Sequence, residues 1–451
     1  MEGHSNNIDL EMEMKELRQT FNSGKTKEES WRISQLKNLM SMLVEKEDEI
    51  NLALKQDLGK HPVESFRDEV GPLIKSVNYA LKGLKKWMSA KKADLPLAAF
   101  PASAHLVPEP LGVVLIISSW NFPFGLSFEA LIGAIAAGNA AVLKPSDLAP
   151  ASSSALAKLI NSYLDTKAIK VIEGGASVGE QLLQQKWDKI LFTGSSSVAR
   201  VVMTAAAKNL TPVALELGGK CPAVVDSLSS SWDRKTEYCN ETYSFSEIDV
   251  CRQACVAIDY ILVEKKFSST LVELLKAAIL SVFGENPKES NNIARIINKS
   301  HFSRLKNLLN DPMVQASIVH GGSLDEDNLI EFINSLPKAL AIYAFTNNEG
   351  LKKKISSGTS SGSIVFNDAI IQYVADSLPF GGVGESGIGR YHGKFSFDMF
   401  SHEKVIARRS FLVDFWFRYP PWNDHKLHLF RSAYNFDYLG ILLIMLGLKR
   451  S

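Results

Sequence analysis

The chain has 451 residues, enough for roughly two to four domains of ordinary size, each with its own hydrophobic core. Its 50 Lys and Arg residues almost balance its 49 Asp and Glu residues, and the net charge of +1 excludes a protein that holds nucleic acid through charge. A hydrophobic content of 45% with 22% charged residues is typical of a globular protein and excludes a disordered or collagen-like chain.

The N-terminal region predicts a helix rather than a targeting segment. No basic stretch followed by an apolar run opens the chain, so no secretory signal is predicted. Between Ser30 and Leu58 the apolar residues recur at three- and four-residue spacing, which predicts one long helix with a single apolar face. The Pro-containing stretch 95–101 is predicted to be extended.

From Gly112 to Leu217, short β-branched runs alternate with segments of helix-forming composition. The predicted strands are 113–117, 140–143, 169–172, 190–192 and 213–215. The predicted helices are 128–137, 153–163, 178–185 and 197–208. Strands and helices in this alternation predict an α/β fold with a doubly wound, parallel, Rossmann-like sheet that binds ligands beyond the carboxyl ends of its strands.

A second α/β lobe is predicted after Lys220, where short strands such as 364–367 and the glycine cluster 380–389 occur. The chain closes on an uncharged run, Tyr438 to Leu448, which is too short to span a bilayer because a spanning helix needs about 20 residues. Two interpretations stay open for this tail: packing on the protein or a partner subunit, or an interfacial membrane contact.

All four cysteines lie between Cys221 and Cys255, and no disulfide framework could organise so long a chain from there. A reducing compartment is therefore predicted. Their spacing completes no zinc ligand set, so no metal site is predicted. The nine histidines form no paired motif and are predicted to be solvated or capping residues.

Three polar residues lie at the ends of the predicted strands or in loops. Asn121 follows the first predicted strand, Glu216 follows the fifth, and Cys255 lies near the second lobe. Taken one at a time, each has an ordinary structural explanation as a turn former, a solvated strand end or a small core residue. Only their combination with further motifs indicates a shared chemistry.

The combined motifs resemble the aldehyde dehydrogenase family, specifically its class 3 branch as found in plants. The matching stretches are 110–114, Trp120-Asn121-Phe122-Pro123, 138–140, Lys144-Pro145-Ser146, Phe192-Thr193-Gly194-Ser195, Leu215-Glu216-Leu217-Gly218-Gly219-Lys220, Gln253-Ala254-Cys255 and Leu378-Pro379-Phe380-Gly381-Gly382-Val383. They follow one another in the family's order over almost the whole chain.

The resemblance implies an NAD(P)-dependent oxidation of hydrophobic aldehydes to carboxylic acids. Cys255 would be the nucleophile that forms a thiohemiacetal, because a planar aldehyde does not give up its hydrogen readily. The Asn121 amide and the Cys255 backbone N–H would form the oxyanion hole. Glu216 would be the general base that activates water against the resulting thioester.

The resemblance also implies a set of cofactor-binding residues, for NAD or NADP. They are Trp120, Lys144, Ser146, Asp147, Gly194, Ser195 and Phe380. Lys144 would reach the adenosine ribose, and Gly194-Ser195 would let the following helix approach the dinucleotide. The family commonly has Glu where this chain has Asp147, which leaves the choice between NAD and NADP open. Gly174 to Gly179 is interpreted as either a phosphate loop or a connector.

Two departures from the family pattern bear on activity. The segment from Trp232 to Arg252 has no helical apolar period, and Arg252 stands where relatives have Gly before the nucleophile motif. In addition, Leu329 runs directly into Ile330, where relatives carry a longer segment with a Glu-Ile-Phe-Gly-Pro motif that clamps the nicotinamide half of the cofactor. The alternative hypothesis is therefore a catalytically impaired chain that binds dinucleotide or pairs with an intact subunit.

The predicted domain organisation follows the same resemblance. Residues 1–94 and 108–214 would form the cofactor-binding domain, 215–395 the catalytic domain, and 95–107 with 396–451 an oligomerisation arm and tail. A homodimer is expected, without nucleic-acid partners. The expected location is the cytoplasm, with the surface of the endoplasmic reticulum membrane as the alternative.

Overall fold

The computed structural model describes residues 10–96, 99, 101–226, 253–286, 290, 293–312, 326–411, 414–446 and 448. The chain divides into two compact units, one of Met1–Trp87 with Pro110–Ser401 and one of Met88–Glu109 with His402–Ser451. This division does not test the predicted boundary at residue 215, which lies within the first unit.

The first unit contains a six-stranded sheet in the order β12-β7-β6-β3-β4-β5. Its strands are β3 (Val113–Ile117), β4 (Ala140–Lys144), β5 (Ile169–Val171), β6 (Lys189–Gly194), β7 (Val213–Leu217) and β12 (Gly387–Ile388). Strands β3 to β7 are all parallel, so the predicted doubly wound sheet is confirmed. The strand order reverses between β3 and β6, and parallel sheets bind ligands at such a point.

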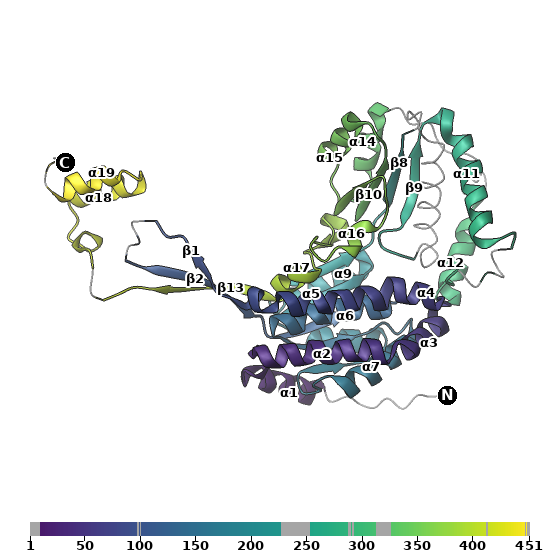
Figure 1. Ribbon diagram of the computed structural model, residues 1–451, viewed down its shortest axis with the longest axis horizontal. Helices are drawn as coiled ribbons and strands as arrows, with labels where there is room; N and C mark the ends of the chain where they lie inside the picture. The colour runs from purple at the N-terminus through teal and green to yellow at the C-terminus, as the bar shows by residue number, and fades with distance from the viewer. Residues whose placement is uncertain are drawn as a thin grey trace. The chain divides into compact units, whose positions relative to one another are not determined.

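Helices pack against this sheet, and several of them lie side by side in the lower part of Figure 1. They include α1 (Leu10–Asn22), α6 (Pro123–Ala137), α7 (Pro150–Tyr163), α8 (Ala176–Gln184) and α9 (Ser196–Ala207). One apolar cluster joins α1, α8 and α9 to the alternate strand residues Val113 and Leu115, which therefore face the same side. Every residue of α6 is buried, which makes this helix the fixed support for the loop before it.

The N-terminal helices differ from the sequence prediction. The single helix predicted over 30–58 is wrong, because α2 (Glu29–Glu45) ends at Lys46 and α3 (Glu47–Leu58) begins a new axis there. Lys46 has φ −118° and ψ 20°, outside the helical region, and this break lets both short helices turn their apolar faces inward. The remaining N-terminal elements are η1 (Lys25–Lys27), α4 (Pro62–Ser65), the π-helical turn η2 (Phe66–Val70) and α5 (Gly71–Met88).

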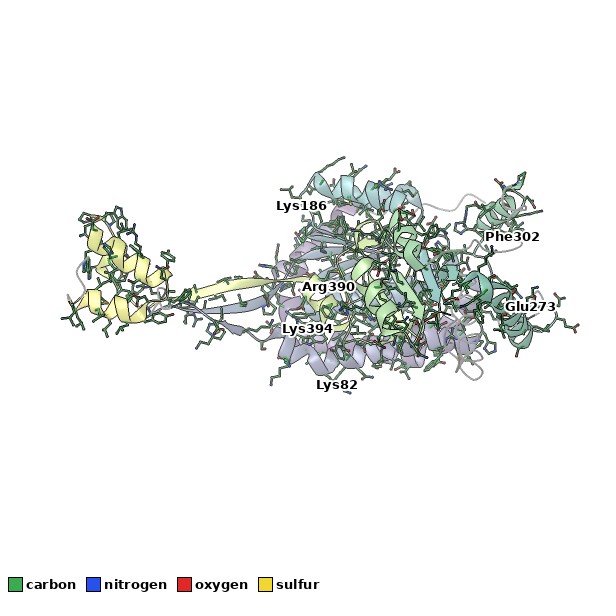
Figure 2. All side chains as sticks on the ribbon, turned by 90° about the horizontal axis from the view of Figure 1, so that it is seen from above. Lys82, Lys186, Glu273, Phe302, Arg390 and Lys394 are labelled. Atoms are coloured by element: carbon green, nitrogen blue, oxygen red, sulfur yellow. The ribbon has the colours of Figure 1, made fainter. Side chains whose placement is uncertain are left out.

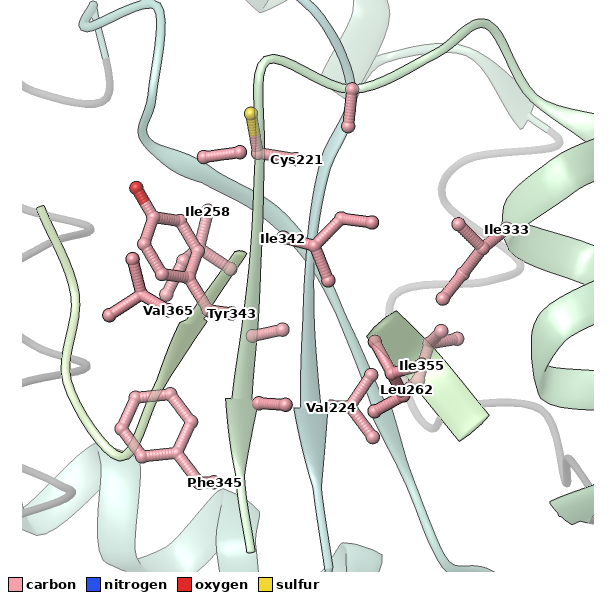
Figure 3. Packing of buried hydrophobic residues seen from close by; sticks show 14 of the residues in the cluster. Cys221, Val224, Ile258, Leu262, Ile333, Ile342, Tyr343, Phe345, Ile355 and Val365 are labelled. Carbon is pink, nitrogen blue, oxygen red and sulfur yellow. The ribbon is translucent and has the colours of Figure 1, made fainter. Parts of the chain in front are cut away.

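A second, four-stranded parallel sheet has the order β11-β10-β8-β9, which confirms the second α/β lobe. Its strands are β8 (Cys221–Val225), β9 (Ile258–Val263), β10 (Ala341–Phe345) and β11 (Ser363–Phe366). Figure 3 shows Tyr343 on the side of Ile258 and Val365, whereas Ile333 and Ile355 lie on the other side. The glycine cluster, placed by sequence in this lobe, instead contributes β12, which pairs with β7 of the first sheet.

The helices associated with the second sheet are α11 (Lys265–Phe283), α12 (Lys299–Leu309), α14 (Glu326–Ser335), α15 (Glu349–Gly358) and α16 (Ile371–Val374), followed by η5 (Gly384–Ser386) and α17 (Gly393–Met399). Glu273 on α11 and Phe302 on α12 point away from the unit into solvent (Figure 2).

The second unit is a three-stranded sheet, in the order β1-β2-β13, with two C-terminal helices. Its elements are β1 (Lys91–Ala93), β2 (Ser103–Pro110), β13 (Ser401–Arg408), η6 (Trp416–Arg418), α18 (Asp424–Tyr434) and α19 (Tyr438–Met445). Among the described residues, no helix combines the length and apolar character that crossing a bilayer requires.

Candidate active site

Cys255 lies in a short turn immediately before β9, and side chains from other strands fix this turn. The Cys255 carbonyl accepts a hydrogen bond from the Cys221 thiol at 3.6 Å. The next carbonyl, that of Val256, accepts one from the Tyr343 hydroxyl at 2.8 Å. Because both donors stand on buried strands of the second sheet, the position of Cys255 is set by the core of that lobe.

The Asn121 side chain reaches this turn from the other sheet. Asn121 follows β3, is 7% exposed, and donates from Nδ2 to the Gln253 carbonyl at 2.8 Å. An amide nitrogen carries two hydrogens, so this bond orients Asn121 and leaves a second donor. Its Oδ1 atom is buried and has no hydrogen-bond partner among the described residues. The Asn121 side chain is therefore bound to the loop that carries Cys255, at Gln253, two residues before the cysteine.

Glu216 lies within β7 at its carboxyl end and is 4% exposed. Neither carboxyl oxygen has a hydrogen-bond partner in the described part of the chain. Burial raises the pKa of this carboxyl well above its ordinary value, and its charge acts on the thiol of Cys255. A buried carboxyl without partners needs a proton or a water molecule, and it is suited to accept a proton from water.

The Cys255 thiol resists ionisation in this arrangement. Burial raises its pKa to about 12, and the neighbouring Cys221 and Glu216 act in the same direction. The backbone N–H groups of Cys255 and Val256 oppose the shift but do not overcome it. With this pKa the thiol is protonated near neutral pH, so Cys255 would have to lose its proton in order to act as a nucleophile.

An apolar cavity of about 300 Å³ opens onto Cys255. Its walls come from η2, the start of α5, the start of α6, the turn at Cys255, the segment 368–374 and Phe380. The apolar members include Pro72, Phe122, Leu126, Val256, Ile370, Tyr373 and Phe380. Arg67 and Asp68 of η2 are charged members of the lining, and they bond to each other, with 2.6 Å between Nη2 and Oδ2. The cavity therefore suits a hydrophobic substrate.

Lys144 and the Gly194-Ser195 turn lie at the carboxyl edge of the first sheet, on opposite sides of β3. The register pairs Ile117 with Lys144 on one side and with Phe192 on the other. The Lys144 stem is buried, and burial lowers the pKa of its ammonium while Asp147 opposes the shift. Ser195 caps α9. A cation and a helix N-terminus at the same edge of a sheet are each suited to bind a phosphate-bearing ligand.

The other expected cofactor residues occupy two different places. Ser146 accepts the Leu148 N–H at 3.3 Å in the turn after β4, and the Asp147 carboxylate lies 4.0 Å from the Lys144 ammonium. Trp120 instead packs edge-on against His301 of α12, with 5.3 Å between ring centroids. Phe380 lines the apolar cavity beside Cys255 rather than the Lys144 edge.

One sequence expectation about histidines is wrong. His392 is 3% exposed, and both ring nitrogens lack partners among the described residues. Burial lowers its pKa to about 4, so the ring is neutral near pH 7. It packs against Tyr373 at 4.7 Å, behind the cavity wall. No periodicity in the sequence marks this position as buried.

Sequence reasoning also missed Lys60 and Glu69, a fully buried ion pair at 2.7 Å beside the Asn121 loop. Their nine-residue separation carries no motif that could have identified them. The altered segment from Trp232 to Arg252, singled out by sequence, lies outside the described residues.

The comparisons with known proteins identify the family of the chain. The sequence model of the aldehyde dehydrogenase family matches residues 4–328 and 323–406. Aldehyde dehydrogenase family 3 member F1 of Arabidopsis thaliana is 50% identical, with 98% of this chain and 99% of the relative covered. The chain belongs to the aldehyde dehydrogenase family. It is an enzyme that oxidises aldehydes to carboxylic acids with NAD or NADP, as its sequence resemblance implied.

Two further relatives support the membership. The chloroplastic aldehyde dehydrogenase family 3 member I1 of Arabidopsis thaliana is 44% identical, covering 96% of this chain and 85% of the relative. A substrate-bound structure of the aldehyde dehydrogenase AldH from Staphylococcus aureus is 36% identical, with a TM-score of 0.88, and covers 94% of this chain and 99% of that one.

The comparisons also bear on the junction between Leu329 and Ile330. The alignment with the family 3 member F1 relative runs over 479 positions, more than the 451 residues of this chain, so the relative carries residues that the chain lacks. The family model matches in two segments that meet at 323–328, immediately before this junction. Here α14 continues across the junction as one helix.

The raised thiol pKa predicts slow alkylation of Cys255 in the cofactor-free chain. At pH 8 we expect iodoacetamide to label Cys255 on the order of 50-fold more slowly than free cysteine, after allowing for the greater nucleophilicity of a high-pKa thiolate. The rate should rise about tenfold per pH unit up to pH 10. Peptide mass spectrometry measures it, and a plateau below pH 9 would contradict the assigned pKa.

Proposed function

We propose that Cys255, Asn121 and Glu216 carry the oxidation in this chain, with Cys255 as nucleophile. The sulfur forms a bond to the aldehyde carbon while the thiol proton passes to a water molecule, and the carbonyl π electrons move to oxygen. The observation that carries the proposal is the 2.8 Å bond from Asn121 Nδ2 to the Gln253 carbonyl, because it holds the amide at the turn that carries Cys255 and leaves its second hydrogen for a substrate oxygen.

The dinucleotide that the family uses would be held at the edge formed by Lys144, Asp147, Gly194 and Ser195. The Lys144 ammonium would bind the adenosine ribose or its phosphate, and the N-terminus of α9 would face the pyrophosphate. When bound, the cofactor supplies the two-electron acceptor for the thiohemiacetal carbon.

Glu216 acts in the hydrolysis that follows. It takes a proton from a water molecule while the water oxygen bonds to the thioester carbon, and the carbon–sulfur bond then breaks to release the acid. The unpartnered carboxyl oxygens of Glu216 support this role, since they have acceptor capacity to spare for water. Because burial raises the pKa of Glu216, the base becomes available as the pH rises.

The apolar cavity supports hydrophobic aldehydes, of medium or long chain or aromatic, as substrates. Its lining contributes ring and branched aliphatic side chains, whereas Arg67 and Asp68 neutralise each other. The gathering of Asn121, Cys255 and Glu216 favours turnover over the impaired-chain hypothesis. Without the clamp motif, we expect a weaker hold on the nicotinamide half.

Two substitutions test the roles of the catalytic residues. Cys255→Ala should abolish formation of reduced cofactor from hexanal. Glu216→Gln should still give a single burst and then stop, because the acyl group stays on the sulfur. Stopped-flow absorbance follows the burst, and mass spectrometry of the intact chain detects the acyl adduct. Full turnover by Glu216→Gln would remove Glu216 from its role, and turnover by Cys255→Ala would remove the nucleophile.

The cofactor preference is predicted to depend on Asp147. Its carboxylate, 4.0 Å from Lys144, would bind a ribose hydroxyl but repel a 2′-phosphate. We expect Asp147→Asn to raise kcat/KM for NADP relative to NAD by about tenfold, a change of roughly 1.4 kcal/mol. Glu180→Gln, on the outer side of α8, is the matched control. An unchanged ratio of the two kcat/KM values would exclude this role.

The second unit is proposed to mediate homodimer formation, with membrane contact as the alternative. Strand β13 is an edge strand of its sheet, and α19 exposes Leu439, Leu442 and Met445. Large exposed apolar side chains in a group indicate an interaction surface. The proposed location is therefore the cytoplasm, or a membrane surface if the tail binds lipid.

Replacing Leu439, Leu442 and Met445 together by Ser tests these assignments. We expect the parent chain to be predominantly dimeric and the variant to have a dimer Kd about tenfold higher. Sedimentation velocity measures both. Co-sedimentation with anionic liposomes distinguishes the alternative. A parent chain that is monomeric and pellets with the liposomes would replace the dimer by membrane contact.

A further inference from the structure

The loop that carries Asn121 leads into α6, and the first turn of α6 is bonded to a buried ion pair from another part of the chain. Lys60 Nζ lies 2.7 Å from Glu69 Oε1, and both side chains are 0% exposed. The other oxygen of Glu69 accepts the backbone N–H groups of Phe124 at 2.9 Å and Gly125 at 3.0 Å. Phe122, the N-cap of α6, gives no side-chain cap. Glu69 therefore caps α6 from η2.

The loop is held on both sides of Asn121. The Lys60 ammonium lies 4.4 Å from the ring centroid of Phe122, the residue directly after Asn121. On the other side, the Ser118 hydroxyl lies 2.7 Å from that of Ser127, which in turn donates to the backbone. A short segment fixed at both ends has few backbone conformations, so the direction of the Asn121 side chain follows from these contacts.

The turn before Lys60 also holds the nucleophile loop. The Leu58 carbonyl accepts the Arg295 backbone N–H at 2.6 Å, and the Arg295 carbonyl accepts the Gln253 side-chain amide at 3.1 Å. Gly59 adopts φ +68°, and a Cβ there would lie 2.9 Å from the Arg295 Cγ, so only glycine allows this approach. Gln253 then accepts the Asn121 amide on its carbonyl.

We propose that Lys60 and Glu69 are positioning residues for the aldehyde oxidation, which set the Asn121 amide against the Cys255 sulfur. The contacts close a ring: from the turn at Lys60 through Glu69 and α6 to Asn121, and from the same turn through Arg295 and Gln253 back to Asn121. The inference rests on the proposed role of Asn121 as an oxyanion donor.

The Lys60–Glu69 pair is expected to matter more for the position of the Asn121 amide than for the stability of the fold. A buried ion pair is weak evidence for stability, because two charges lose their hydration on burial. A donor displaced by about 1 Å, in contrast, can cost on the order of 100-fold in rate. The same turn, η2, places Arg67 and Asp68 in the aldehyde cavity, so it connects the cavity wall to the oxyanion donor.

The test uses Glu69→Gln and Lys60→Met in the full-length chain with saturating cofactor. Glu69→Gln has the same shape and keeps an oxygen for the two N–H groups, but it no longer attracts Lys60. We expect each variant to lower kcat by about 10- to 100-fold, with the KM for hexanal within about threefold of the parent. Alkylation of Cys255 needs no oxyanion donor, so its rate should stay within about twofold.

A cycle with Asn121→Ala separates positioning from a general loss of structure. If Glu69 acts through Asn121, adding Glu69→Gln to Asn121→Ala lowers kcat no further. Three outcomes would overturn the inference. The double variant could lose kcat by the product of the two single losses, Glu69→Gln could keep the parent kcat, or kcat and the alkylation rate could fall together. If Asn121→Ala itself keeps full kcat, the proposed function fails instead.

Two further variants complete the design. Glu49→Gln removes one partner of the exposed pair with Lys158, at 2.6 Å, and should leave kcat unchanged. If either single variant fails to fold, Lys60→Met/Glu69→Gln leaves no unpaired buried charge and can replace it. The double variant should also show a lowered kcat with unchanged alkylation, and parent-like kcat there would overturn the inference.

Discussion

The candidate active site depends on one hydrogen bond between two sheets that belong to different parts of the chain. Asn121 follows β3 of the first sheet, and the Gln253 carbonyl precedes β9 of the second. A charge that develops on the aldehyde oxygen is stabilised only by donors already in place, because reorienting them during the reaction costs free energy. The 2.8 Å bond keeps the amide in one orientation before any substrate arrives.

Burial determines the protonation states of the two titratable side chains in this site, Cys255 and Glu216. The same apolar surroundings that would suit a hydrophobic aldehyde also raise the pKa values of Cys255 and Glu216. In the neutral form, neither group repels the other, and the folded chain avoids two uncompensated buried charges. Cys255 and Glu216 would therefore lose their protons only when a substrate or a water molecule is present to take part in the proton transfer. A site built this way protects its thiol from adventitious electrophiles.

Much of the fold could be predicted from the sequence because local patterns report local structure. The β-branched runs in 113–117 and 213–215 form buried parallel strands, as expected. The break at Lys46 was not foreseen, since the apolar spacing continues through it and only packing decides where the axis bends. Strand β12 joins the first sheet rather than the second for the same reason: pairing partners of a two-residue strand are chosen by tertiary contacts.

The sequence by itself determined the family, and it predicted Asn121, Glu216 and Cys255 as the chemistry-bearing residues, because both rest on short contiguous motifs. Only the tertiary structure decided that Lys60, Glu69 and Arg295 contact the loops of Asn121 and Cys255, that His392 is buried, and that Phe380 lines the apolar cavity. Such contacts join residues up to hundreds of positions apart. No periodicity or spacing encodes them, because they exist only once the two sheets have packed together.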